Sequence, residues 1–277
     1  MGRSISRRRV LGAAASFAVT GAVGIEARSS TRMSRSRVRD PAHFVLVHGA
    51  WHGAWCWYRI VAALEAVGHR ATAIDLPSAG IDATPVSTVT LQAQADRVIA
   101  LLDPLPTPVV LVGHSAGGPV ISTVAEARPE KIAKLVYLTA YLLPAGSSIL
   151  SAVQQDPGSL VFGNVIVGPE GISLRPEAVR DIFYGTSDDA DVALARALLK
   201  PVGIMPTANA VAVGAAFESV RRFYIACRRD HAITHGFQQT MYTALPCEKV
   251  YTLNSDHSPF FSHPVALVRV LGAIARA

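Results

Sequence analysis

Apolar residues after residue 40 occur in two patterns, continuous runs and residues spaced three and four apart, and the two kinds of stretch alternate along the chain. Short runs that are apolar throughout are typical of buried strands, and they fall at 44–47, 71–76, 109–112, 132–139, 221–227 and 248–253. Stretches with apolar residues three and four apart are typical of helices, and they fall at 55–67, 89–102, 117–127, 234–245 and 264–277. This alternation predicts an α/β fold with a mostly parallel, doubly wound sheet.

The pattern changes between residues 144 and 216, where prolines and glycines are scattered and one clear helical stretch remains, at 188–199. We interpret this part as a cap inserted after a core strand. Half of all residues are hydrophobic and only 17% are charged, which excludes a disordered chain. The predicted organisation is one domain over residues 40–277 that carries the cap at about 144–216.

The net charge of +6 is concentrated in the first 39 residues. They contain nine arginines and one acidic residue, Glu26. Taking these from the totals of 26 basic and 20 acidic residues leaves 17 basic and 19 acidic residues in the rest of the chain. The part that we expect to fold is therefore slightly acidic, and its charge gives no reason to expect a nucleic-acid partner.

Residues 1–39 have the layout of an export signal followed by a basic linker. Arg7, Arg8 and Arg9 precede an apolar, Ala- and Gly-rich stretch at 11–25, and paired arginines there are typical of the twin-arginine route. This stretch is shorter than the roughly 20 residues that span a membrane, so we expect no stable span in the mature protein. The predicted location is periplasmic or secreted. Translation from Met33 would instead give a cytoplasmic product, and that alternative stays open.

The cysteines and histidines do not form a metal-binding pattern. Cys56, Cys227 and Cys247 lack metal-ligand spacing, and an odd number gives no disulfide framework, although a single bridge after export stays open. His48 and His52 are four residues apart, but they straddle a turn and no third ligand joins them. We expect no metal and no cofactor.

The five residues Gly-His-Ser-Ala-Gly at 113–117 lie between a predicted strand and a predicted helix, which is the context of a nucleophile elbow. Glycines at both ends allow a turn so sharp that a β-carbon there would collide with its neighbours. The turn lifts Ser115 above the carboxyl edge of the sheet, beside the N-terminus of a helix whose free N–H groups favour negative charge. Ser115 is therefore the predicted nucleophile.

A serine hydroxyl is a weak nucleophile at neutral pH, so a base must take its proton. In folds with this elbow, the acid and then the histidine follow the serine along the chain. His257 follows the last predicted strand in a polar turn, and it is the predicted base. His263 is predicted to cap the N-terminus of the last helix, and His231 and His235 are predicted to lie at the surface or in the pocket.

The acid that orients the base must lie on a loop at the same edge. Asp230 comes three residues after the strand at 221–227, and it is the predicted acid. Asp256 is the rival, but adjacent side chains in an extended loop point apart, so its carboxylate reaches His257 poorly.

Two backbone N–H groups are needed to stabilise the oxyanion of a tetrahedral intermediate. Ala116, directly after the nucleophile, supplies one of them in this prediction. Ala50, in the loop after the first strand, supplies the other, and Gly49 beside it permits a close approach of the backbone.

Several segments of this sequence resemble the plant methylesterase and hydroxynitrile lyase family. They are residues 43–53 (HFVLVHGAWHG), Trp55, Trp57 and Tyr58, Leu64-Glu65, Gly68-His69, Asp75-Leu76, the elbow, 191–201, 219–227 and Asp256-His257. The resemblance spans nearly all of residues 43–277. It implies a capped esterase of the α/β-hydrolase fold, with Ser115, Asp230 and His257 as its catalytic triad.

Two positions separate the branches of that family. Hydroxynitrile lyases of this type carry Thr where Gly49 stands and Lys where Ser258 stands, so the resemblance favours ester hydrolysis. A lyase that cleaves cyanohydrins is the first alternative, and a non-catalytic small-molecule receptor on the same fold is the second.

The expected substrate is a small apolar or aromatic ester. Lactones and carbamates need the same three residues and stay open. Apolar residues in and beside the cap are candidates to line the pocket, namely Leu142, Leu143, Phe162, Ile166 and Phe217. The sequence gives no indication of the oligomeric state.

Overall fold

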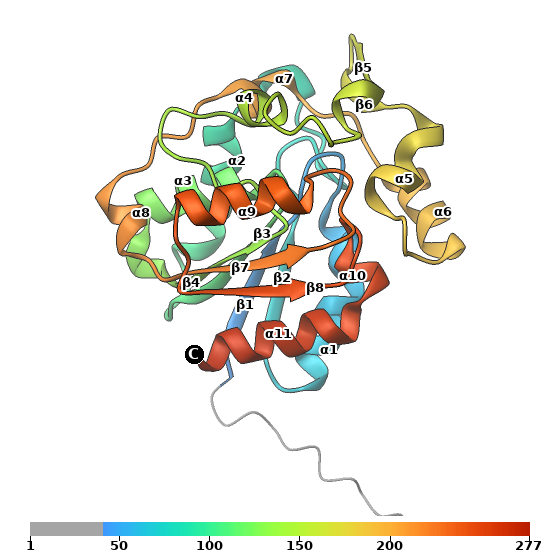
Figure 1. The fold of residues 1–277 in the computed structure, drawn as a ribbon. Coiled ribbons are helices and arrows are strands. Elements are labelled where there is room, and N and C mark those ends of the chain that lie inside the picture. The colour runs from blue at the N-terminus through green and yellow to red at the C-terminus, as the bar shows by residue number, and fades with distance from the viewer. Residues whose placement is uncertain (1–40) are drawn as a thin grey trace, which may run out of the picture. The chain divides into compact units, whose positions relative to one another are not determined.

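The computed structural model describes residues 41–277, and the predicted export signal and linker lie outside the described residues. Six parallel strands form the central sheet, in the order β2-β1-β3-β4-β7-β8 (Figure 1). Their bounds are β1 (His43–Val47), β2 (Arg70–Ile74), β3 (Val109–His114), β4 (Ile132–Leu138), β7 (Arg222–Cys227) and β8 (Lys249–Leu253). The parallel sheet confirms the predicted α/β, doubly wound architecture, and each strand lies within two residues of its predicted bounds.

Helices cover both faces of this sheet because successive side chains of each strand point to opposite sides. In β1, Val45 and Val47 belong to one core cluster, whereas Phe44 and Leu46 belong to the other. The first cluster also contains side chains of α2 (Leu91–Leu102), α3 (Gly117–Ala127) and α9 (His235–Ala244). The second contains side chains of α1 (Tyr58–Ala66) and α11 (Pro264–Arg276).

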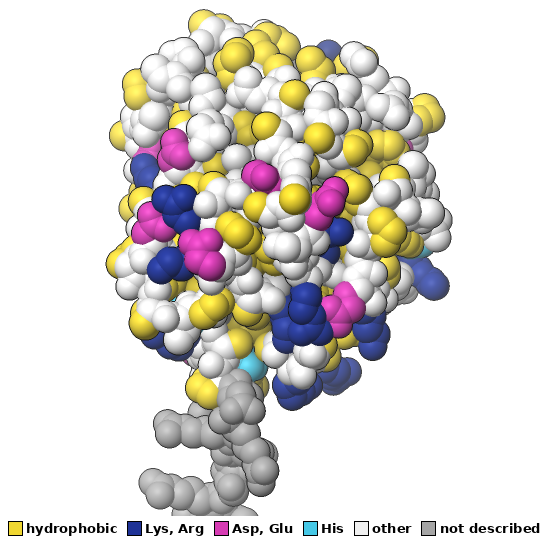
Figure 2. All heavy atoms as spheres, turned by 90° about the vertical axis from the view of Figure 1, so that its left-hand side faces the viewer, with side chains coloured by type: hydrophobic (Ala, Val, Ile, Leu, Met, Phe, Trp, Pro, Cys, Tyr) yellow, Lys and Arg dark blue, Asp and Glu magenta, His cyan; other side chains and the backbone are white. Residues whose placement is uncertain are grey.

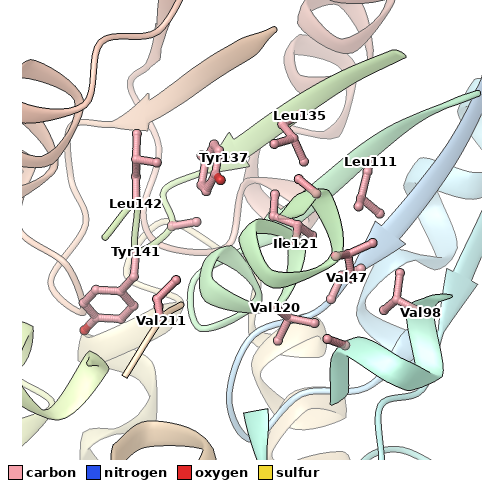
Figure 3. Close-up of a cluster of buried hydrophobic side chains, with 14 of the residues drawn as sticks. Val47, Val98, Leu111, Val120, Ile121, Leu135, Tyr137, Tyr141, Leu142 and Val211 are labelled. Carbon is pink, nitrogen blue, oxygen red and sulfur yellow. The ribbon is translucent and has the colours of Figure 1, made fainter. Parts of the chain in front are cut away.

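Figure 3 shows the first core cluster, where Val120 and Ile121 of α3 lie beside the strand residues Val47 and Leu111. All four side chains are fully buried. Each such burial contributes roughly 1.5–3 kcal/mol. Because α3 begins two residues after Ser115, this packing anchors the helix that follows the elbow.

The segment between β4 and β7 contains more regular structure than its sequence pattern predicts. The expected helix at 188–199 is present as α6 (Asp189–Leu198). The other elements are α4 (Ile149–Val153), β5 (Val165–Gly168), β6 (Gly171–Leu174), α5 (Val179–Phe183), α7 (Ile204–Ala208) and α8 (Ala215–Ser219). Strands β5 and β6 form an antiparallel hairpin. These elements are five residues long or shorter, which is too short for a helical or strand period to stand out.

The remaining short helices lie in loops. They are η1 (Ala54–Trp57), η2 (Val86–Thr88), η3 (Pro129–Lys131), η4 (Phe162–Asn164), η5 (Pro176–Ala178) and α10 (Pro259–Ser262).

A bidentate ion pair joins helix α6 of the cap to helix α1 of the core. Both terminal nitrogens of Arg59 on α1 lie 2.7 Å from carboxylate oxygens of Asp191 on α6.

The strand order places a topological switch point between β1 and β3. The chain leaves β1 toward β2 on one side and later returns to β3 on the other, so the loops that follow β1 and β3 diverge and leave a crevice. Loops after β4, β7 and β8 end at the same carboxyl edge, because all six strands are parallel. Every predicted catalytic residue therefore lies at the carboxyl edge of the sheet.

Charges and cysteines of the described residues do not suggest further chemistry. Figure 2 shows Lys and Arg side chains next to Asp and Glu side chains on one face, and ion pairs such as Arg128–Asp103 join exposed groups. Cys56, Cys227 and Cys247 are all free. Among residues 41–277, no helix combines the length and the apolar character that a membrane crossing needs.

Candidate active site

Ser115 occupies the turn between β3 and α3 with φ of +53°, in the left-handed region that L residues rarely adopt. The two elbow glycines make this turn possible. A β-carbon on Gly113 would stand 2.7 Å from the carbonyl oxygen of Gly117, and one on Gly117 would stand 2.8 Å from the carbonyl oxygen of His48. The glycines therefore stand where the sequence argument requires them, and the backbone strain falls on Ser115.

Asp230 and His257 form a completely buried pair at the same edge of the sheet. Oδ2 of Asp230 lies 2.7 Å from Nδ1 of His257. Four further donors serve the carboxylate: the N–H groups of Ala232 (2.7 Å) and Ile233 (2.9 Å), the Thr139 hydroxyl, and the Gln238 amide (3.4 Å). A carboxylate held in this way makes Nδ1 the protonated nitrogen of the neutral imidazole, and Nε2 is then free to accept a proton.

Thr139 and Gln238 are two functional neighbours that the sequence argument missed. Thr139 directly follows β4 with φ of +39°, an unusual backbone conformation for a β-branched residue. Gln238 is fully buried on α9 and also bonds to the backbone of Cys227 in both directions, at 3.0 and 3.1 Å. A polar residue on the buried face of a predicted helix is a signal that could have identified Gln238.

The structure brings His257 next to the elbow without a hydrogen bond to the nucleophile. The Nε2 of His114, the residue before Ser115, donates to the carbonyl oxygen of His257 at 2.8 Å, and the two rings are 4.6 Å apart. The Nε2 of His257 is buried and has no partner among the described residues. No hydrogen bond joins it to the Ser115 hydroxyl in this conformation, and a proton transfer between the two requires them to come within hydrogen-bond distance.

A histidine fixes the peptide group that carries the predicted Ala50 donor. The Nδ1 of His48 donates to the carbonyl oxygen of Gly49 at 2.8 Å, while its Nε2 accepts from the N–H of Leu76 at 3.1 Å. The Gly49 carbonyl and the Ala50 N–H belong to one planar trans peptide, so they point in opposite directions. Holding the carbonyl therefore sets the direction of the N–H.

The next peptide of the loop is held by His52 and a cap residue. The Nδ1 of His52 donates to the carbonyl oxygen of Ala50 at 2.8 Å, and its Nε2 accepts from the Tyr184 hydroxyl at 2.6 Å. Both side chains are buried. All four ring nitrogens of His48 and His52 are therefore used in hydrogen bonds that shape the loop.

Replacing Gly49 by Thr is expected to lower kcat for ester hydrolysis by about 100-fold or more, the usual loss when an oxyanion donor is removed. A β-carbon at Gly49 would lie 2.6 Å from the β-carbon of Ser115 and 3.1 Å from the carbonyl oxygen of His114, so the loop must move. The control is Gly236→Ala, since a β-carbon there meets nothing within 4 Å. Steady-state rates that are equal in both variants would contradict this role for Gly49.

Burial lowers the pKa of three histidines around the site. It lowers that of His52 to about 3, and it lowers those of His48 and His114, the last of which is also next to His257. These rings are neutral in the folded protein, and for His48 and His52 the hydrogen bonds that Nε2 accepts require it.

The stability of the protein is therefore expected to fall in mild acid. Histidine in the unfolded chain has a pKa of 6.5. Below that pH the unfolded chain binds protons at these three positions and the folded protein does not, so the free energy of unfolding decreases as the pH falls further. Each such histidine contributes up to about 1.4 kcal/mol per pH unit in this range. Urea unfolding between neutral pH and mild acid measures the slope. His52→Gln should flatten it and exposed His231→Gln should not; an unchanged slope in His52→Gln would contradict the assignment.

A cavity of about 290 Å³ opens beside Ser115, near the lower end of the size range of ligand pockets. Ala50 and Ala116, the predicted oxyanion donors, line it together with Ser115. The cap contributes apolar side chains from 149–174 and 183–204. No charged side chain belongs to its lining among the described residues. The cavity suits a neutral, apolar ligand.

The prediction of cap residues that line this cavity is right for Phe162 alone. Leu142, Leu143 and Phe217 are at most 3% exposed and belong to the first core cluster, together with side chains of α3. Ile166 is 44% exposed and lies outside the lining, because its neighbours Val165 and Val167 take the cavity side of β5.

Asp256, the rival acid, faces away from the imidazole of His257. Its carboxylate accepts hydrogen bonds from the Thr186 N–H (2.9 Å), the Ser187 hydroxyl (3.0 Å), the Ser258 N–H (3.0 Å), and the hydroxyls of Ser262 (2.8 Å) and Ser255 (3.3 Å). It therefore ties the loop that carries His257 to the cap. His263 stands at the N-cap of α11, but its side chain makes no capping hydrogen bond.

Comparison with known proteins agrees with the fold. Residues 44–270 match the model of the alpha/beta hydrolase family. Methylesterase 18 of Arabidopsis thaliana is 36% identical over 253 residues, which cover 83% of this chain and 95% of that protein. The crystal structure of the methylesterase MES16 from Arabidopsis has a TM-score of 0.74 and 32% identity, with 85% of this chain and all of that chain covered.

Some relatives are longer than this chain. Putative methylesterase 11, chloroplastic, of Arabidopsis thaliana is 37% identical over 249 residues, which cover 84% of this chain but only 64% of that protein. The chain thus spans less than two thirds of that relative.

Proposed function

This chain belongs to the alpha/beta hydrolase family and is related to plant methylesterases, and from that premise we propose that it is a serine hydrolase that cleaves small carboxylic esters. The observation that carries the proposal is the buried Asp230–His257 pair, with Oδ2 and Nδ1 2.7 Å apart, at the sheet edge where the strained Ser115 follows β3. A structural turn alone needs neither the strained serine nor the ordered imidazole beside it.

In the proposed reaction, the Ser115 oxygen attacks the ester carbonyl while Nε2 of His257 takes its proton. The N–H groups of Ala50 and Ala116 stabilise the oxyanion, and Asp230 stabilises the imidazolium that forms. The carbon–oxygen bond to the alcohol then breaks, and His257 returns the proton to the leaving alcohol. Water, activated by the same imidazole, attacks the acyl-enzyme and releases the acid and free Ser115. This chemistry requires no cofactor and no metal.

The apolar cavity supports a neutral ester as substrate. Its lining lacks a charged side chain among the described residues, so a substrate that bears a charge would lose hydration without gaining a partner. The carboxylate product carries such a charge, which favours its release. The names of the relatives support a methyl ester, whose alcohol is small enough that the acyl group must fill the cavity.

Ester hydrolysis is preferred over cyanohydrin cleavage because of Gly49 and Ser258. A side chain at Gly49 would collide with Ser115 in this backbone. Ser258, which stands where the lyases of this family carry Lys, is a buried, uncharged residue. A non-catalytic receptor is not preferred, because a protein that only binds a ligand does not need the hydrogen-bonded Asp230–His257 pair.

A substrate panel tests the proposed function. The purified protein is assayed with methyl and aryl esters, with a lactone and a carbamate of similar size, and with mandelonitrile. We expect acid release from the esters, with neutral apolar acyl groups preferred over acyl groups that carry a charge, and no release of cyanide. Cyanide release, or binding of every ester without turnover, would overturn the proposal.

We propose further that residues 1–39 are a targeting segment that uses the twin-arginine route. The support is the order of Arg7 to Arg9 and the apolar stretch at 11–25. N-terminal sequencing of the native protein tests this, and the first residue is expected to lie after the apolar stretch and to be neither Met33 nor Ser34. A product that begins at Met33 would show that the protein is made without the segment.

A further inference from the structure

Tyr141 brings a polar group into the apolar cavity. Its backbone is fixed to the elbow, because its N–H donates to the carbonyl oxygen of Ser115 at 3.1 Å and its carbonyl oxygen presses on Gly118, where a β-carbon would come within 2.2 Å. Its side chain is 6% exposed and lines the cavity that Ser115 also lines. Figure 3 shows the hydroxyl at the end of the ring directed away from Val120 and Ile121 of the core.

The Tyr141 hydroxyl has no hydrogen-bond partner among residues 41–277, whereas the polar side chains of the lining other than the nucleophile Ser115 each have one. The Thr207 hydroxyl donates to the carbonyl oxygen of Ile204 at 2.7 Å, and the Trp51 ring N–H donates to the carbonyl oxygen of Ile172 at 2.8 Å. Among the described residues that line the cavity, Tyr141 is therefore the one residue besides the nucleophile whose side-chain donor has no acceptor. The hydroxyl oxygen is not sealed inside the protein, because it is absent from the fully buried polar atoms that lack a partner, and Tyr141 lines the cavity. A ligand oxygen that enters the cavity can therefore accept a hydrogen bond from it.

Burial and the nearby carboxylates of Asp230 and Asp156 raise the pKa of the Tyr141 hydroxyl. The group is therefore protonated under working conditions. A protonated phenol beside two carboxylates is a donor, and it favours an uncharged oxygen that accepts a hydrogen bond.

We propose that the Tyr141 hydroxyl binds a second oxygen of the substrate, and that the preferred substrates are esters whose acyl chain carries an ether, keto or hydroxyl oxygen. This inference rests on the proposed ester hydrolysis. The first oxygen, that of the ester carbonyl, is held by the N–H groups of Ala50 and Ala116, so an oxygen farther along the acyl chain is the one left to bind Tyr141. The acyl group is then fixed at two points, and an all-carbon chain leaves Tyr141 unpaired.

Matched methyl esters test the proposal. Methyl octanoate is compared with analogues in which an ether oxygen replaces, in turn, each chain methylene beyond the second, and kcat/KM is measured for the wild type and Tyr141→Phe. For at least one analogue, the ratio of its kcat/KM to that of methyl octanoate should fall about 10-fold in Tyr141→Phe. Intrinsic reactivity cancels in this comparison, because both enzymes receive the same esters. The all-carbon ester should be hydrolysed by the variant at least as well as by the wild type.

Tyr242→Phe is the matched control, since Tyr242 packs on Tyr224 outside the cavity lining. Ratios that change by less than about two-fold in Tyr141→Phe for every analogue, or that change equally in Tyr242→Phe, would overturn the role of Tyr141. A wild type that hydrolyses none of the esters would instead overturn the proposed function. Thermal unfolding of both variants shows that each is folded.

Discussion

Ser115→Ala is expected to lower kcat/KM for methyl ester hydrolysis by about 10⁴- to 10⁶-fold, the loss seen when a triad nucleophile is removed. Without the hydroxyl, no acyl-enzyme can form, and the cavity and the oxyanion donors alone retain little activity. Alanine keeps the β-carbon, so the backbone strain at φ of +53° is unchanged and the variant should fold as the wild type does. Steady-state kinetics and a thermal melt measure both effects.

The matched control is Ser219→Ala, in which an exposed hydroxyl that bonds to the Ala216 carbonyl is removed. Its kcat/KM should equal that of the wild type. A folded Ser115→Ala variant that retains more than about a tenth of the wild-type activity would contradict the assignment of the nucleophile.

Asp230→Asn is expected to lower kcat by about 10⁴-fold with little change in KM. An amide in place of the carboxylate can present N–H to Nδ1 of His257, which then accepts and leaves the proton on Nε2. The imidazole is then the wrong tautomer to take a proton from Ser115. The steady-state rates as a function of ester concentration separate the two parameters.

Asp256→Asn distinguishes the catalytic carboxylate from its rival. Five donors surround Asp256, including those of Thr186 and Ser187 in the cap, so an amide there should lower the melting temperature. Its kcat should stay within about 10-fold of the wild-type value, since Asp230 still orients His257. A larger loss in Asp256→Asn than in Asp230→Asn would reverse the two assignments.

The fold of the core could be predicted because its elements are long enough to show a period. Strand β3 is apolar from Val109 to Val112, and α3 repeats apolar residues over eleven positions. The elbow followed from the same evidence, since Gly113 and Gly117 stand where a buried strand changes into a helix. Once those elements were placed, the parallel sheet required the loops that carry Asp230 and His257 to end at one edge.

Thr139 and the His52–Tyr184 pair could not be predicted as parts of the site, because each acts through a contact between distant segments. Thr139 reaches Asp230 across 91 positions, and His52 reaches Tyr184 across 132. The β5–β6 hairpin was not predicted, because its strands have only four residues each. An apolar residue such as Leu142 suits the core as well as the wall of a pocket, so the residue type alone does not show which of the two it belongs to.

Covalent labelling with a fluorophosphonate, followed by peptide mapping, tests the central claim most directly. The probe reacts with a serine whose oxygen is activated by a neighbouring base and whose developing oxyanion is stabilised. We expect one adduct per chain, on Ser115, with labelling lost in Ser115→Ala and strongly slowed in His257→Ala. An active enzyme whose single adduct maps to another residue, or whose labelling rate is the same in His257→Ala, would contradict the convergence of Ser115, His257 and Asp230 on one reaction.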